Sequence, residues 1–314
     1  MSLDYLHNHP EFPDLIRIVA EEQSIDPALI EKDYWIMHCL FGLQKAGMTF
    51  ELKGGTSLSK GYGIIQRFSE DIDLRINPPT EMNIPIGHNQ DKPAQRQRRK
   101  EFYDWLASEI RIEGLYECQR DTLFDDTKYR SGGIRLLYKT FSAPLEGVKT
   151  GILLEVGFDD VNPNEPQDMS SWAYEYAAKK VPALDNRPKG VPCYHPGYTL
   201  VEKLQTISTK FRKQQETQVF SENFMRHYYD VYCLLQAPLV QSFITTPDYH
   251  THKTKRFRQG DNPIIEKNEA FSLQDPKIRE EYKKAYKNSR NLYYKGQPDF
   301  DEIMNLIQRF IKRL

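Results

Sequence analysis

Two glycines and two acids lie close together in the N-terminal half of the sequence. Gly54 and Gly55 follow a strand-like run, and Asp71 and Asp73 alternate with apolar residues a short distance further on. Side chains of a strand alternate between its two faces, so both aspartates are expected on one face. Two carboxylates held this close repel each other unless a cation lies between them. Mg²⁺ suits this position, because it takes hard oxygen ligands and leaves other positions to phosphate oxygens.

The two glycines predict a sharp turn, because a residue without Cβ lets the backbone approach a ligand closely. Thr56 is predicted to be the N-cap of a helix that runs on through Lys60. The start of a helix presents free N–H groups to an anion, here the triphosphate of an NTP. Lys60 is expected either to contact the γ-phosphate or to extend along the surface. Ser69 is expected to cap the loop before the two acids or to contact a phosphate.

A third acid lies in the middle of a later strand. Residues 151–158 predict that strand, and Glu155 is flanked there by apolar residues, which is costly unless the charge is paired or metal-bound. We therefore predict Glu155 as the third carboxylate of the site, with Asp159 and Asp160 as alternatives. Three acids would hold two Mg²⁺ ions, which clamp the attacking and leaving oxygens of a nucleotidyl transfer. Glu155 would also accept the proton of the attacking hydroxyl.

The segment Lys53–Leu74, KGGTSLSKGYGIIQRFSEDIDL, resembles the AbiEii/AbiGii abortive-infection toxin branch of the polymerase-β-like nucleotidyltransferase superfamily. The upstream Ile30–Trp35, IEKDYW, resembles the leading helix of that branch, and the likeness extends to about residue 235. The resemblance implies a nucleotidyltransferase that is the toxin of a toxin–antitoxin or phage-defence pair. It also implies tRNA as an acceptor, as for some relatives, and a cognate antitoxin encoded nearby.

Two further positions follow from the resemblance. Lys203 in VEKLQTIS and Asp230 in RHYYDVYCLL match motif positions of the branch. The resemblance implies that Lys203 neutralises the charge of the triphosphate and that Asp230 orients Lys203 or Arg226. The residues alone also allow a solvated Lys203 and an ordinary i, i+4 ion pair between Arg226 and Asp230. His227 stands where relatives often carry an acid, so this sequence lacks that acid.

The elements that must position these residues predict an α+β fold. An amphipathic helix begins at Asp26-Pro27 and carries an apolar stripe to Phe41. A proline-rich loop over 77–93 leads to a helix at 93–111, and strands follow at 132–138 and 151–158. Later helices are predicted at 197–213, 222–236, 276–289 and 300–313. We expect a mixed-sheet nucleotidyltransferase core with N-terminal helices in 1–165 and a mainly helical C-terminal domain in 166–314.

Composition limits the setting of the protein. A net charge of −1 argues against binding nucleic acid through overall charge, and no stable DNA binding is expected. The sequence has no apolar run long enough for a membrane span and no signal-peptide pattern at its start, which predicts a soluble, cytoplasmic protein. Basic runs at 92–100, 253–258 and 282–294 would hold RNA through phosphate contacts and base stacking, or are solvated faces.

Three functions fit these observations. The leading hypothesis is an Mg-dependent nucleotidyltransferase that moves an NMP from an NTP to a hydroxyl of RNA, such as tRNA, or of protein. A small-molecule nucleotidyltransferase, similar to those that modify aminoglycosides, would share the metal site but needs an acidic acceptor pocket. A non-catalytic NTP-binding module would bind nucleotide without turnover, and the presence of all three acids gives no sign of such a decayed site.

Overall fold

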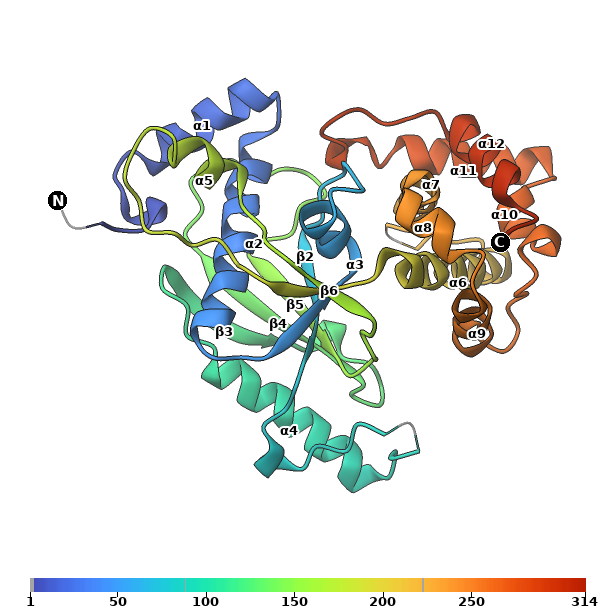
Figure 1. The fold of residues 1–314 in the computed structure, drawn as a ribbon, viewed down its shortest axis with the longest axis horizontal. Helices are drawn as coiled ribbons and strands as arrows, with labels where there is room; N and C mark the ends of the chain where they lie inside the picture. Colours follow the sequence, from blue (N-terminus) through green and yellow to red (C-terminus); the bar gives the residue numbers. More distant parts are fainter. Residues whose placement is uncertain (1–2, 88, 222) are drawn as a thin grey trace. The chain divides into compact units, whose positions relative to one another are not determined.

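The protein folds into two compact units. The structure is a computed structural model that describes residues 3–87, 89–221 and 223–314 (Figure 1). The first unit comprises the chain up to Tyr62 together with Phe68–Tyr194, and the second comprises Gly63–Arg67 together with His195–Leu314. The boundary in the second half of the chain therefore lies at 194/195, whereas the sequence placed it at 165/166.

A seven-stranded mixed sheet forms the centre of the first unit (Figure 1). Its order is β3-β4-β5-β2-β1-β7-β6, with β2 parallel to β5 and antiparallel to β1. The strands are β1 (Phe50–Lys53), β2 (Asp71–Ile76), β3 (Leu115–Asp121), β4 (Ser131–Tyr138), β5 (Ile152–Gly157), β6 (Asn164–Gln167) and β7 (Val191–Tyr194). The predicted α+β class is confirmed. Because β6 and β7 pair at one edge of this sheet, the first unit extends to Tyr194.

Two helices of the first unit, α2 (Pro27–Lys45) and α4 (Pro93–Glu109), pack on the sheet. The helices α1 (Phe12–Gln23) and α5 (Trp172–Ala177) pack on α2 and on each other. As predicted, α2 begins after Asp26, whose carboxylate accepts a hydrogen bond from the Ala28 N–H at 2.8 Å. Trp35 of α2 stacks on Tyr138, and Tyr103 of α4 lies against Gly132. Both strand residues share a face of β4, so α2 and α4 cover that face and leave the opposite one for the acids.

The glycine turn forms the short helix α3 (Gly54–Thr56), which continues as a π-helical turn, η2 (Ser57–Gly61). The prediction that Thr56 is the N-cap is wrong, because the N-cap is Lys53. The chain already turns at Gly54, where φ is +73°, so the N-cap lies three residues earlier than expected.

The described residues of the second unit form helices and loops. Its helices are α6 (Pro196–Thr217), α7 (Arg226–Gln236), α8 (Pro238–Phe243), α9 (Pro247–Arg256), α10 (Glu269–Ser272), α11 (Pro276–Lys287) and α12 (Phe300–Phe310). The predicted helices at 197–213, 276–289 and 300–313 correspond to α6, α11 and α12. The predicted helix at 222–236 corresponds to α7, although its predicted first residue lies outside the described residues. No helix in the described ranges has both the length and the hydrophobicity to cross a bilayer.

Candidate active site

Asp71, Asp73 and Glu155, hereafter the acid site, lie on one face of two neighbouring strands. Buried and half-buried residues alternate along β2, and Ile72 and Leu74 are fully buried on its other face. Asp73 is the direct register partner of Glu155 across the parallel β2–β5 pair. The predicted alternation and the predicted proximity of the third acid agree with this register. The catalytic and metal-binding roles of the three acids remain predictions.

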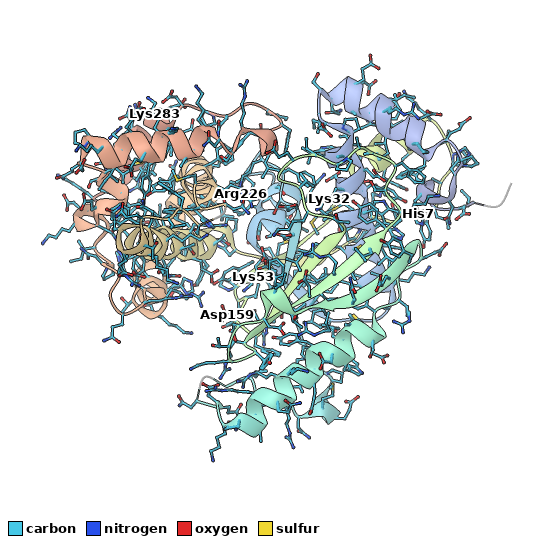
Figure 2. The ribbon with its side chains drawn as sticks, turned by 180° about the vertical axis from the view of Figure 1, so that it is seen from behind. His7, Lys32, Lys53, Asp159, Arg226 and Lys283 are labelled. Atoms are coloured by element: carbon cyan, nitrogen blue, oxygen red, sulfur yellow. The ribbon has the colours of Figure 1, made fainter. Side chains whose placement is uncertain are left out.

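The alternative third acids lie just beyond β5 and are engaged elsewhere. The Asp159 carboxylate is 3.9 Å from the ammonium of Lys53, and the two residues are labelled side by side in Figure 2. The Asp160 carboxylate is 3.8 Å from the guanidinium of Arg75. Glu155 lies within β5 itself, directly opposite Asp73. The geometry therefore favours Glu155 as the partner of the two aspartates.

Close contacts hold the glycine turn against β2. A Cβ added to Gly54 would lie 1.8 Å from Asp73 Oδ2, so the Asp73 carboxylate occupies the place of a side chain there. The Thr56 hydroxyl donates a hydrogen bond to the backbone oxygen of Asp71 at 2.7 Å. The first N–H groups of α3 are thus placed beside the acid site, with little freedom for the turn to move away.

The acid site carries more negative charge than its surroundings compensate. Burial and the charges of Asp73 and Asp71 raise the pKa of Glu155 to about 8, with a further contribution from a hydrogen bond between the Glu155 and Asp73 carboxyl groups. Burial also raises the pKa of Asp71, against the attraction of Lys149. One oxygen of Asp71, Oδ1, is buried without a hydrogen-bond partner.

A divalent cation fits this donor set. Carboxylate oxygens are the ligands that Mg²⁺ prefers, and the buried Oδ1 of Asp71 has a lone pair to offer. Among the described residues, no group of three or more His, Cys, Asp or Glu side chains is arranged closely enough to hold a metal ion without movement.

The other residues predicted to bind nucleotide lie on or after α3. Gly55 is buried within α3, and Ser69 is half-buried in the loop before β2. The Lys60 ammonium lies 2.6 Å from the buried Asp33 carboxylate of α2 and 4.1 Å from the ring centre of Trp172. Lys60 is thus anchored by an acid that the sequence did not single out as its partner. Contacts of Gly55, Lys60 and Ser69 with a nucleotide remain predictions.

Lys203 and Asp230 meet in the second unit. Asp230 is fully buried, and the Lys203 ammonium lies 2.9 Å from its Oδ2. The guanidinium of Arg67 donates two further hydrogen bonds to the same carboxylate, at 2.7 and 2.8 Å. Burial alone would raise the pKa of Asp230, but the charges of Arg67 and Lys203 hold it well below its usual range. These three residues are called the Asp230 cluster below.

Sequence reasoning missed three residues at these sites. Arg67 stands 163 positions before Asp230, and nothing local in the sequence pairs them. Lys149 lies 3.6 Å from Asp71, and the buried Lys32 pairs with Glu70. For Lys32 the available signal was IEKDYW, where Glu31, Lys32 and Asp33 interrupt a mostly apolar run.

The structure removes part of the predicted RNA-binding surface. Tyr282, Tyr286 and Tyr293 of the third basic run are 0%, 2% and 7% exposed, so the prediction that they stack on bases is wrong. In the first run, the Arg99 guanidinium is buried and donates hydrogen bonds to three backbone carbonyls. These runs follow the periodicity of helices whose inner faces pack into the protein, which a sequence pattern of Tyr and Lys does not reveal.

Comparisons with known proteins identify a family. The sequence model described as "Nucleotidyl transferase AbiEii toxin, Type IV TA system" matches residues 35–306, a range that contains the acid site and the Asp230 cluster. A comparison with curated protein sequences gives no match. The crystal structure of an antigenic nucleotidyltransferase-like protein from Paracoccidioides brasiliensis is similar over 73% of this chain and 94% of that chain, with 13% identity and a TM-score of 0.30. A likeness this weak carries no argument about function.

Proposed function

The chain belongs to the AbiEii family of nucleotidyltransferase toxins, which are described as part of a type IV toxin–antitoxin system, and from this we propose that it moves an NMP from an NTP to a hydroxyl of RNA in an Mg²⁺-dependent reaction. The main support is that Asp73 and Glu155 are register partners on neighbouring strands. Beside them the chain turns at Gly54, where a Cβ would collide with the Asp73 carboxylate. This arrangement brings anionic metal ligands and free backbone N–H groups to one place.

In this proposal each part of the site has a distinct task. The N–H groups at the start of α3 bind the triphosphate, and Asp71, Asp73 and Glu155 hold the cation. When bound, Mg²⁺ would neutralise the triphosphate and the charge that develops on the attacking and leaving oxygens. The acceptor hydroxyl oxygen bonds to the α-phosphorus while the bond from that phosphorus to the bridging oxygen breaks, and pyrophosphate leaves.

Glu155 is the proposed acceptor of the hydroxyl proton. Its pKa is raised to about 8, chiefly by burial and then by the neighbouring aspartates. A bound cation would favour the ionised form of this group, so Glu155 would stand as a carboxylate beside the attacking hydroxyl and could accept its proton. Glu155 is therefore better suited to this task than Asp159 or Asp160, which lie next to basic side chains.

A polyanionic acceptor fits the remaining basic surface better than a cationic drug does. Lys284, Lys287 and Arg290 are exposed on and after α11. Lys287 and Arg290 also line a hollow of about 780 Å³ in the second unit. Such cations bind phosphates without regard to base sequence. We propose tRNA as the first candidate acceptor, with a cognate antitoxin encoded nearby and growth arrest of the host cell, as in phage defence, as the outcome.

Incubation of the purified protein with each α-³²P-labelled NTP, Mg²⁺ and total tRNA tests the proposal. Label is expected on tRNA with wild-type protein, and neither Asp73→Asn nor Glu155→Gln should transfer it. Lys189→Gln, a change at an exposed lysine whose ammonium pairs with Asp185, should behave as wild type. Failure to label any RNA or protein in an Mg²⁺-dependent manner would refute the proposal, and label on an aminoglycoside instead would favour the small-molecule alternative.

A further inference from the structure

Lys149 borders the acid site from the loop between β4 and β5. Its ammonium lies 3.6 Å from Asp71 Oδ2 and 4.9 Å from the ring centre of Phe124, and its side chain is 27% exposed. The distance to Asp71 is longer than a normal hydrogen bond, so the carboxylate attracts the ammonium without binding its N–H groups closely. A lysine ammonium has three such donors, and these are positioned at the edge of the acid site.

Two buried charged residues fix the backbone at Lys149. The Glu70 carboxylate accepts a hydrogen bond from the Lys149 N–H at 2.9 Å, and the Lys32 ammonium donates one to the Lys149 carbonyl at 2.6 Å. Lys32 and Glu70 also pair with each other at 3.3 Å, with side chains only 2% and 1% exposed. Figure 2 shows Lys32 on α2, within the first unit.

Such a pair is a weak source of stability. Burial of two charges costs about as much free energy as their attraction returns, and well-packed apolar residues often stabilise a fold more. The contacts of Lys32 and Glu70 instead have a geometric effect, because they hold both the N–H and the C=O of one loop residue. A loop residue fixed on both sides carries its side chain to a defined place.

The surroundings of Lys149 mark one side of the acid site. Phe124, the ring nearest its ammonium, packs on Gly133, where an added Cβ would lie 2.8 Å from the Phe124 Cβ. Gly133 is the register partner of Glu155 on β4. In the sheet, β4 lies on one side of the β5–β2 pair and β1 lies on the other. The glycine turn follows β1 and therefore borders the acid site from that second side. Lys149 and the glycine turn thus flank the acids from two sides.

We infer that Lys149 binds a phosphate group of a substrate and that Lys32 and Glu70 are positioning residues that hold it in place. A substrate phosphate that approaches three carboxylates needs a fixed cation of the protein in addition to the metal, and lysine supplies a compact charge with several donors. This inference rests on the proposed function, because that function supplies the substrates. The phosphate belongs either to the donor triphosphate or to the backbone of the acceptor strand.

Two binding experiments on the full-length protein distinguish these sources. Calorimetry with magnesium tripolyphosphate, which carries no base, measures the donor chemistry, and fluorescence anisotropy with tRNA over a series of salt concentrations measures the acceptor chemistry. The variants are Lys149→Gln, Lys149→Arg and the control Lys189→Gln. The clamp of Lys32 and Glu70 acts on backbone atoms, so Lys149→Gln should fold normally, and its urea unfolding curve verifies this.

Lys149→Gln is expected to weaken one of the two ligands by about tenfold or more, the loss typical of one charged hydrogen bond. If that ligand is tRNA, the slope of log Kd against log salt should also fall by about one. Lys149→Arg should keep most of the affinity. The inference is overturned if Lys149→Gln binds both ligands as Lys189→Gln does. If Lys149→Gln loses phosphate binding but the wild-type protein transfers no nucleotide, the proposed function is contradicted. The assignment of Lys149 as a phosphate-binding residue is then still supported.

A double-mutant cycle tests the positioning role. Glu70→Gln keeps a hydrogen-bond acceptor for the Lys149 N–H but removes the charge that pairs with Lys32. It should weaken phosphate binding by a few-fold in the wild-type background and leave it unchanged in the Lys149→Gln background. Equal losses in both backgrounds would show that Glu70 acts independently of Lys149, which would overturn its assignment as a positioning residue.

Discussion

The acid site and the Asp230 cluster are built from similar residues in opposite ways. The acid site gathers three carboxylates, and burial together with mutual repulsion raises the pKa of Glu155 to about 8. The Asp230 cluster surrounds one buried carboxylate with Arg67 and Lys203, whose charges lower its pKa. The acid site has excess negative charge, whereas in the Asp230 cluster Arg67 and Lys203 neutralise the buried carboxylate.

We expect this difference to separate acids that bind a ligand from an acid that stabilises the fold; the catalytic roles of Lys203 and Asp230 stay predictions. Uncompensated buried carboxylates destabilise a protein until a cation binds, so removal of one should relieve repulsion. A carboxylate that neutralises two neighbouring cations has the opposite effect, because its removal leaves buried charge unpaired. Substitution of acids in the two regions should therefore change activity and stability in different proportions.

The largest expected effect is the loss of transfer in Asp73→Asn. Activity should fall by about a thousandfold, as for removal of a group that stabilises charge at a reaction centre. The free energy of unfolding in Mg²⁺-free buffer should stay the same or rise, because the repulsion with Glu155 is removed. Initial rates of label transfer and urea unfolding at neutral pH measure the two quantities. A loss of stability that matches the loss of activity would contradict the comparison.

Asp230→Asn should have its main effect on folding. It leaves the buried Arg67 guanidinium without its carboxylate, which lowers the free energy of unfolding by about 3 to 5 kcal/mol. Asp248→Asn, at an exposed acid in the first turn of α9, is the matched control and should change stability by less than about 1 kcal/mol. Urea unfolding of both variants makes the measurement. Equal stability of the two would show that the Asp230 cluster is not required for the fold.

The pH dependence of stability should reveal the excess charge of the acid site. Glu155 has a pKa of about 8 in the folded protein, above the ordinary value of 4.5, so the folded state binds its proton more tightly than the unfolded state does. The contribution of Glu155 to the free energy of unfolding should therefore be largest below about pH 4.5 and should decrease as the pH rises toward 8. The decrease should be on the order of a few kcal/mol in Mg²⁺-free buffer.

Glu155→Gln should remove this part of the pH dependence, which urea unfolding from pH 5 to 8.5 would detect. Asp230 should add no slope in that range, because its pKa is lowered and its contribution is lost only in acid. If wild type and Glu155→Gln show parallel curves, Glu155 does not carry a raised pKa.

Gly54→Ala should lower stability by less than Asp230→Asn does, and it should disturb the acid site. An added Cβ would lie 1.8 Å from Asp73 Oδ2 at a backbone φ of +73°. Gly47→Ala is a close control, since Gly47 has a φ of +74° with nothing within 4 Å of the added Cβ. Both variants should lose about 1 kcal/mol from backbone strain, and only Gly54→Ala should also lose transfer activity. Equal activities would show that the contact with Asp73 is unimportant.

Local patterns predicted where the three acids lie, although their roles stay predictions. The alternation of Asp71 and Asp73 with apolar residues fixed their common face, and an acid inside an apolar strand pointed to Glu155. These features depend only on the two-residue period of a strand. The N-cap of α2 at Asp26 was predictable for a similar reason, because capping involves neighbours in sequence.

Long-range features were not predictable in this way. The Asp230 cluster depends on Arg67, which is remote in sequence, and Lys149 is held by Lys32 across 117 positions. The edge strands β6 and β7 contain Pro166 and Pro192, residues that weaken a strand pattern although an edge tolerates them. Because their pairing is decided by the rest of the sheet, the sequence alone did not place these strands in the first compact unit. Thr56 was misassigned because a glycine began the helix.

Uptake of Mn²⁺, a paramagnetic substitute for Mg²⁺, tests most directly whether the acid site is a cation site. The free Mn²⁺ signal in electron paramagnetic resonance can be followed with tripolyphosphate present, at neutral pH, for wild type, Asp73→Asn, Glu155→Gln and Lys189→Gln. Wild type and Lys189→Gln should remove Mn²⁺ from solution, and the two acid-site variants should bind it at least about tenfold more weakly. Equal uptake by all four proteins, or none by wild type, would contradict the assignment of Asp71, Asp73 and Glu155 as the metal ligands of this nucleotidyltransferase.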